Sequence, residues 1–267
     1  MDKMKTTLLS RPGSGIIIPK PVQHAKIKLF CLPFAGGSSA IFRSWPKHMP
    51  DTVEVCAVEI PGRGQRINEP LSQRIETLVA ELSLEIKNSI DRPFALFGHS
   101  LGAILGFEIA HHLKNNFGLK PVHLFLSGTK APQLESDKKL IYNLPETEFL
   151  AEIKKLNGTP DEVFEHQDLL KLMIPILRAD FKLCETYTYE ARTPLDCPIS
   201  VLGGLQDQHI AKETLEPWNA QTNGPFFLRM FPGDHFYLND HQQILLSTIT
   251  RDINAHFNLN ILQRRIL

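Results

Sequence analysis

The segment GHSLG at residues 98–102 has the pattern Gly-x-Ser-x-Gly, which places a serine between two glycines. In this pattern the serine lies at a sharp turn from a strand into a helix, where larger neighbouring side chains do not fit. A short apolar run, 94–97, precedes the pattern, and a helical run to about residue 112 follows it. We therefore predict that Ser100 is a nucleophile. A simple helix-capping role for Ser100 would explain neither glycine.

A serine hydroxyl is a poor nucleophile, so this chemistry needs a base that takes its proton and a carboxylate that orients the base. In folds built around this serine turn, the acid and then the histidine follow the serine along the chain. Asp207 comes just after the apolar run 199–202, and His235 lies in a turn after the apolar run 226–231. We therefore predict Ser100, His235 and Asp207 as nucleophile, base and orienting acid.

Three other side chains compete for these roles. His209 is only two residues from Asp207 and is the alternative base. Asp196 and Asp234 are the alternative acids, but Asp196 precedes its strand and Asp234 directly neighbours His235, a poor geometry for orienting the ring. The remaining histidines precede the acid or lie in the last predicted helix, so the chain order disfavours them.

Acyl transfer puts negative charge on the former carbonyl oxygen, and backbone N–H groups stabilise that charge. Leu101, which follows the serine, supplies one such group. The loop after the first clear strand, 27–32, reads FAGG at residues 34–37 and keeps its backbone accessible. We expect the second N–H from Ala35, with Phe34 as the alternative. No Lys-Ser or Lys-Thr follows these glycines, so they do not predict a phosphate-binding loop.

The elements that must hold these residues follow from the hydrophobic pattern. Apolar runs rich in β-branched residues alternate with segments of helical period, which predicts one α/β domain with a mostly parallel sheet over the 267 residues. Residues 137–190 show helical periodicity and no convincing strand, so we predict a helical insertion that covers the site as a lid. Residues 1–26 are predicted to be a flexible leader. Strands are expected at 27–32, 53–60, 94–97, 122–127, 199–202 and 226–231, and helices at 72–90, from 100 to about 112, and at about 241–257.

Composition excludes several classes of protein. Lys+Arg and Asp+Glu both number 29, so the net charge at pH 7 is zero and nothing favours nucleic acid or anionic lipid. The four cysteines lack metal-site spacing and are too few for a disulfide scaffold, which favours a cytoplasmic protein with reduced thiols. No apolar run is long enough to cross a membrane. Neither a zinc motif nor a dinucleotide motif is present, so we expect no metal and no cofactor.

Taken together, the motifs resemble those of type II thioesterases, which accompany non-ribosomal peptide and polyketide synthetases. The resemblance covers nearly the whole chain and rests on LPFAGGS at 32–38, PGRG at 61–64, GHSLGA at 98–103, the Gly-x-x-Asp ending at Asp207, and GDHF at 233–236. It implies an α/β-hydrolase fold and hydrolysis of acyl thioesters on the phosphopantetheine arm of carrier-protein domains, which clears aberrant loads from a synthetase. It also implies a transient carrier-protein partner and no cofactor beyond the arm that the substrate carries. We expect a monomer.

Other functions use the same three residues. A small-molecule ester hydrolase and the product-releasing thioesterase of a synthetase would both need Ser100, Asp207 and His235. A chain that stands free of a carrier domain favours the clearing role over product release. A binding protein with a vestigial triad is disfavoured because all three residues are intact.

Two residues are candidates for binding the substrate rather than for catalysis. Phe34 lies in the FAGG loop, and Arg63 lies in the PGRG turn, where it could hold the phosphate of the arm by a bidentate charge-assisted bond. The simpler interpretation of Arg63, and of Arg66 beside it, is a solvated surface arginine.

Overall fold

Within residues 15–135, 140–158 and 161–264, which the computed structural model describes, seven strands form a single sheet. The strand order is β1-β3-β2-β4-β5-β6-β7, and every neighbouring pair except β1 with β3 is parallel. This confirms the predicted α/β class with a mostly parallel sheet. The strands are β1 Ile16–Ile17, β2 Ile27–Leu32, β3 Val53–Val58, β4 Phe94–His99, β5 His123–Ser127, β6 Ile199–Gly204 and β7 Phe226–Phe231.

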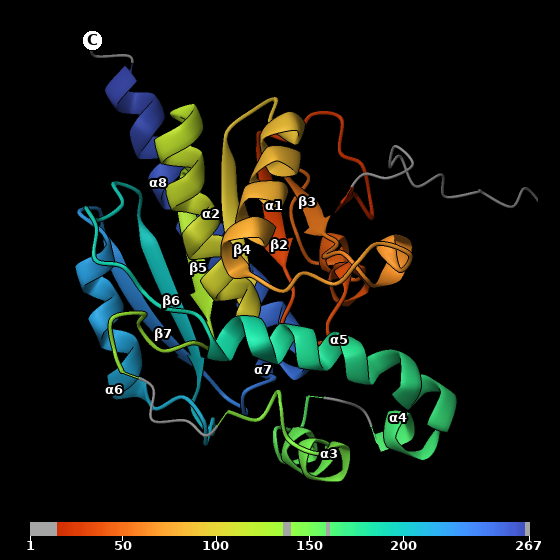
Figure 1. Ribbon diagram of the computed structural model, residues 1–267. Helices are drawn as coiled ribbons and strands as arrows, with labels where there is room; N and C mark the ends of the chain where they lie inside the picture. The colour runs from red at the N-terminus through yellow and green to blue at the C-terminus, as the bar shows by residue number, and fades with distance from the viewer. Residues whose placement is uncertain (1–14, 136–139, 159–160, 265–267) are drawn as a thin grey trace, which may run out of the picture.

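Helices cover both faces of the sheet because each inner strand is apolar on both sides. In β2, Phe30 and Leu32 point to one apolar core, and Leu29 and Cys31 point to the other. Figure 1 shows α1 and α2 on the first face and α8 on the second. The helices outside the segment between β5 and β6 are α1 Ile75–Ser89, α2 Leu101–Phe117, α6 Lys212–Leu215, α7 Tyr237–Asp240 and α8 Gln242–Arg264, with short 3-10 turns η1 Ser39–Phe42, η2 Trp45–Lys47, η3 Gly64–Arg66 and η4 Glu216–Gln221.

The described residues between β5 and β6 form three further helices, α3 Glu146–Lys155, α4 Asp161–Glu165 and α5 Gln167–Glu185. We call residues 140–158 and 161–185 the helical insertion. It has an apolar cluster of its own, in which Phe149 and Ile153 of α3 pack against Leu177 of α5. Figure 1 shows α5 lying across one end of the sheet, with α3 and α4 next to it. This end carries the loops that follow β2 and β3.

The N-terminal segment differs from the prediction of a flexible leader over residues 1–26. Ile16 and Ile17 form β1, which pairs antiparallel with Val58 and Ala57 at the edge of the sheet. Both isoleucine side chains are buried, so the leader prediction is wrong for these residues. A strand of two residues leaves no periodic pattern to detect, and its position depends on β3. Residues 1–14 lie outside the described part.

The C-terminal elements also differ in detail. The apolar run 226–231 forms β7 at the edge of the sheet, and five of its six side chains are only partly buried. The last helix begins close to the expected position and continues to Arg264, beyond the predicted end near residue 257.

Candidate active site

Ser100 occupies a strained turn between β4 and α2. Its backbone has φ 55° and ψ −114°, outside the regions that L-residues ordinarily adopt. A Cβ atom at Gly98 would lie 1.9 Å from the carbonyl oxygen of Gly102, and one at Gly102 would lie 2.2 Å from the carbonyl oxygen of Leu32. Only glycine therefore fits at both positions, and the turn presents the serine side chain at the end of the sheet.

Asp207 and His235 meet at the ends of β6 and β7. His235 Nδ1 lies 2.7 Å from Asp207 Oδ2, and the exposed fractions of the two side chains are 13% and 1%. The other carboxylate oxygen accepts the backbone N–H groups of His209 and Ile210 at 2.8 and 3.1 Å. Burial alone would raise the pKa of the Asp207 carboxyl, but these hydrogen bonds hold its pKa below the usual value. The group is therefore a carboxylate at neutral pH and fixes the hydrogen of His235 on Nδ1.

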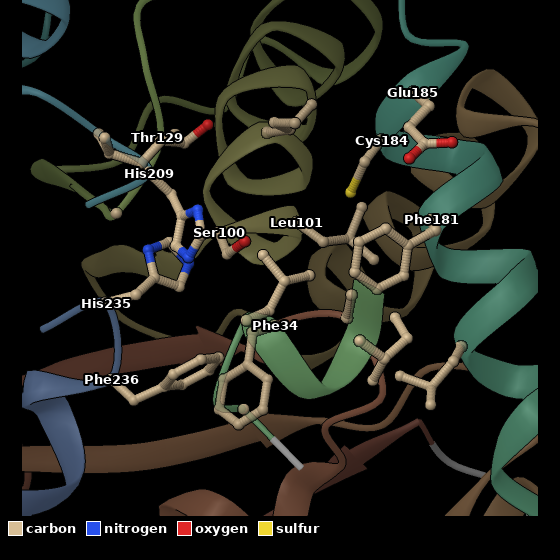
Figure 2. A pocket seen from close by; sticks show the side chains of 18 of the residues that line it. Phe34, Ser100, Leu101, Thr129, Phe181, Cys184, Glu185, His209, His235 and Phe236 are labelled. Atoms are coloured by element: carbon tan, nitrogen blue, oxygen red, sulfur yellow. The ribbon is translucent and has the colours of Figure 1, made fainter. Parts of the chain in front are cut away.

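Ser100 and His235 line the same cavity, which has a volume of about 240 Å³. Ala35, Phe34 and Leu101 line it as well, so the structure brings the predicted nucleophile, base and backbone donors to one place. Figure 2 shows Ser100 and His235 at one end of this cavity and Phe181 at the other. Much of the remaining wall is apolar and comes from the helical insertion, through Leu140, Ile153, Leu156, Leu177, Phe181 and Cys184.

The alternative base and acids are placed differently. His209 lines the cavity, and its ring centroid lies 6.4 Å from that of His235. Asp207, however, binds the ring of His235 and only the main chain of His209. Asp234 accepts the Phe236 N–H, and Asp196 pairs with Lys114 and Lys120 away from the cavity. The geometry therefore favours the assignment of Asp207 and His235.

A buried histidine at the end of β4 packs beside the ring of His235. His99 lies with its ring centroid 4.9 Å from that of His235, and its Nδ1 lies 2.8 Å from Ser127 Oγ. Ser127 Oγ in turn lies 2.6 Å from the hydroxyl of Tyr237. Burial first, and then the proximity of His235, lowers the pKa of His99 well below its usual value. His99 therefore stays neutral and does not compete with His235 for the charge of Asp207.

Arg63 requires a correction. Its side chain is only 4% exposed, and it forms a bidentate ion pair with Asp180 of α5 at 2.5 and 2.7 Å. It does not line the cavity. Both interpretations of Arg63, as a phosphate-binding residue and as a solvated one, are therefore wrong. Arg66 is also buried, at 5% exposed, between the carboxylates of Glu69, Glu81 and Glu85.

Asp180, which accepts the Gly36 N–H, is a buried charge that was not predicted from the sequence. It is 1% exposed and lies on the buried face of α5 with Ile176, Leu177 and Leu183. A charged residue at helical spacing from apolar neighbours is a usable signal, because a buried carboxylate needs a partner. Phe34, the other candidate for substrate binding, lines the cavity and packs edge-on against Phe236 with a centroid distance of 5.0 Å.

The described residues contain no group of three or more His, Cys, Asp or Glu side chains suited to a metal ion. In the same part of the chain, no helix combines the length and apolar character needed to span a membrane.

A serine turn after a central parallel strand, with an acid and a histidine at the ends of later strands, defines the α/β-hydrolase fold. The family model for the thioesterase domain matches residues 27–253, so the chain belongs to the thioesterase family.

Individual proteins are similar to this chain over most of their length. The chain is 39% identical over 248 residues to linear gramicidin dehydrogenase LgrE of Brevibacillus parabrevis, covering 92% of this chain and 94% of that protein. Among solved structures, the type II thioesterase BorB of the borrelidin biosynthetic cluster is 32% identical with a TM-score of 0.84, covering 91% of this chain and 99% of that one. YbtT, a type II thioesterase of the yersiniabactin NRPS/PKS pathway, is 32% identical with a TM-score of 0.82 over the same shares. The resemblance to type II thioesterases is confirmed.

Proposed function

We propose that this thioesterase uses Ser100 to hydrolyse acyl groups from the phosphopantetheine arm of carrier-protein domains, and so edits a non-ribosomal peptide or polyketide synthetase. The observation that carries the proposal is the His235–Asp207 pair, whose histidine lines the same cavity as Ser100 under the helical insertion. The proposed enzyme is a cytoplasmic monomer that meets its carrier proteins transiently. The chemistry calls for no cofactor, since phosphopantetheine belongs to the substrate.

In the first half of the reaction, Ser100 Oγ attacks the thioester carbonyl carbon and passes its proton to His235 Nε2. Asp207 holds the opposite ring nitrogen protonated and stabilises the imidazolium that forms. The backbone N–H groups of Leu101 and Ala35 bind the negative oxygen of the tetrahedral intermediate. The intermediate then expels the thiolate of the arm, which takes the proton from His235 and leaves Ser100 acylated.

In the second half, water replaces the thiol. His235 takes a proton from the water, and the resulting hydroxide attacks the acyl carbon of the ester on Ser100. The same two N–H groups bind the oxygen again. When the intermediate collapses, the proton returns from His235 to Ser100 Oγ and the free acid leaves.

The cavity supports an acyl substrate. Its apolar wall from the helical insertion suits a hydrocarbon or amino-acid side chain, because burying apolar surface there is favourable at roughly 25 cal/mol per Å². BorB and YbtT are type II thioesterases, and YbtT belongs to an NRPS/PKS pathway. Both observations favour an acyl thioester on a synthetase over an unrelated ester.

Replacing the nucleophile tests the proposal. Ser100→Ala is expected to lower kcat for an acyl-carrier thioester by at least about 1,000-fold, because the remaining residues cannot form the acyl-enzyme. Ser247→Ala is the matched control, since Ser247 is exposed on α8 and its hydroxyl donates to the main-chain oxygen of Ile244. Mass spectrometry of several acyl-carrier proteins after incubation measures the hydrolysis directly. A loss of only a few-fold in Ser100→Ala would rule out Ser100 as the nucleophile.

The same assay separates the substrate classes. We expect faster hydrolysis of acyl-carrier thioesters than of p-nitrophenyl esters with the same acyl group. Equal or faster turnover of the free esters would favour a small-molecule ester hydrolase. Exclusive action on one full-length synthetase product would favour product release over editing.

A further inference from the structure

The FAGG loop at residues 34–37 is held by three hydrogen bonds. The Gly37 N–H donates to the carbonyl oxygen of Phe34 at 2.9 Å and closes a tight turn. The Gly36 N–H donates to Asp180 Oδ2 at 2.7 Å, and the carbonyl oxygen of Gly37 accepts from Arg63 at 3.3 Å. Within the described part of the chain, the N–H groups of Phe34 and Ala35 have no hydrogen-bond partner. These two residues line the cavity.

Two of these hydrogen bonds join the loop to residues that are distant from it in the sequence. Asp180 lies on α5 in the helical insertion, and Arg63 lies in the turn after β3. Each is almost fully buried, and both oxygens of Asp180 face the guanidinium of Arg63. Asp180 Oδ2 therefore receives two hydrogen bonds, one from Arg63 and one from Gly36. The ion pair with Arg63 therefore holds Asp180 Oδ2 in place, and this oxygen in turn holds the loop through the Gly36 N–H.

Packing against α5 restricts the loop further. A Cβ atom at Gly36 would lie 2.6 Å from a methyl carbon of Leu177, one helical turn before Asp180. Gly36 also has φ 78°, in the left-handed region that favours glycine. The loop thus lies directly on α5 and takes its conformation from that contact.

We propose that Asp180, held by Arg63, is a positioning residue: by accepting the Gly36 N–H, it orients the FAGG loop so that its unused N–H groups can bind the negative oxygen of the transition state. This inference rests on the proposed function, because it assumes that Ser100 forms a tetrahedral intermediate. Asp180 touches neither Ser100 nor the cavity, so it acts through the loop. The helical insertion then does more than cover the cavity, because it also orients part of the catalytic backbone.

Two double variants separate the hydrogen bond from the ion pair. Arg63→Gln with Asp180→Asn removes both charges but keeps an amide oxygen that can accept the Gly36 N–H. Arg63→Met with Asp180→Leu removes both charges and the acceptor, and its side chains have similar volume. Neither variant leaves a buried charge without a partner, which is the usual reason why single changes in such pairs unfold proteins.

The expected results differ between the two variants. The Gln/Asn protein keeps kcat within a few-fold of the wild type. The Met/Leu protein loses about 100-fold in kcat with little change in KM, because a displaced N–H group weakens transition-state binding more than substrate binding. Its rate of labelling by a fluorophosphonate falls in proportion, since the phosphonyl oxygen occupies the same position. Thermal unfolding shows that both proteins are folded. Equal rates in the two variants, whether high or low, overturn the inference.

One further variant covers a failure of the Met/Leu protein to fold. Glycolic acid in place of Gly36, introduced by nonsense suppression, turns the N–H into an ester oxygen and leaves Arg63 and Asp180 unchanged. The same loss in kcat and in labelling rate is expected, and an unchanged rate overturns the inference.

The outcomes also separate this inference from the proposed function. If Ser100→Ala is inactive but the two double variants react equally, only the role of Asp180 is wrong. If the wild type hydrolyses no carrier thioester yet is labelled at Ser100, the proposed substrate is wrong. The labelling rates of the variants then still decide the role of Asp180.

Discussion

The carboxylate of Asp207 accepts hydrogen bonds from one side chain and two backbone N–H groups. This has a chemical consequence for His235. A carboxylate can only accept hydrogen bonds, so it fixes the imidazole tautomer as well as the orientation of the ring. An amide of the same shape would lack that restriction, because it can donate as well as accept.

Asp207→Asn is therefore expected to lower kcat by several orders of magnitude while the protein stays folded, because the amide stabilises the wrong tautomer and cannot balance the imidazolium. Steady-state kinetics on an acyl-carrier thioester measure the effect. Asp234→Asn is the matched control, since Asp234 neighbours His235 but binds the Phe236 N–H and Asn157 instead. We expect its kcat to stay within about tenfold of the wild type. A larger loss of kcat in Asp234→Asn than in Asp207→Asn would identify Asp234 as the orienting acid.

For single residues, the sequence predicts a position in the site only where neighbouring residues in the chain indicate it. Ser100, Asp207 and His235 each come shortly after an apolar strand, so their places at the end of a parallel sheet could be predicted. Arg63 could not, because an arginine in a glycine-rich turn is ordinarily solvated. Its burial depends on Asp180, a partner 117 residues away in the chain.

At the scale of elements, the junction between β4 and α2 decides whether the serine turn can form. Gly98→Ala is expected to lower the free energy of unfolding by about 2 kcal/mol or more and to reduce activity, because its Cβ would lie 1.9 Å from the carbonyl oxygen of Gly102 and α2 would have to move. Gly106→Ala, within α2, is the control. Its Cβ would make ordinary contacts at 3.7 and 3.8 Å, so the change should stabilise by up to about 1 kcal/mol. Urea unfolding of both variants checks this contrast, and equal changes in stability would contradict it.

The helical insertion shows what an element prediction lacks. Helical periodicity indicates helices between β5 and β6, but it does not say against what they pack. In the structure α3 packs on α5 through Phe149 and Ile153. In turn, α5 contacts the FAGG loop after β2 through Asp180. These contacts depend on the loops after β2 and β3 being in place, which no local pattern encodes.

At the scale of the whole molecule, a chain of polar side chains joins α8 to three strands. His123 of β5 lies 2.8 Å from Ser200 Oγ of β6, and Ser200 donates to Asp252 of α8 at 2.9 Å. Arg229 of β7 donates two hydrogen bonds to the same carboxylate, at 2.8 and 2.9 Å. Asp252 is 4% exposed, so this network ties the last helix to the half of the sheet that carries Asp207 and His235.

The network makes stability depend on pH in the acid range. Burial alone would raise the pKa of the Asp252 carboxyl, but the hydrogen bonds from Arg229 and Ser200 hold its pKa below the usual value. A carboxyl whose pKa is lower in the folded state stabilises fully above its unfolded pKa of about 3.9. That contribution is lost as the pH falls through the folded pKa. Asp252→Asn is therefore expected to lower the free energy of unfolding by about 2 kcal/mol at pH 7.

The difference between the wild type and Asp252→Asn should narrow as the pH falls below about 4, since the asparagine does not titrate and the aspartic acid becomes neutral. Urea unfolding at a series of pH values measures this difference. Asp51→Asn is the control, because Asp51 pairs with Lys20 where the two side chains are 83% and 58% exposed. An exposed pair of this kind contributes at most about 0.5 kcal/mol, with little change across the same range. A difference for Asp252→Asn that stayed constant down to pH 2 would mean that the carboxylate charge does not hold α8 to the sheet.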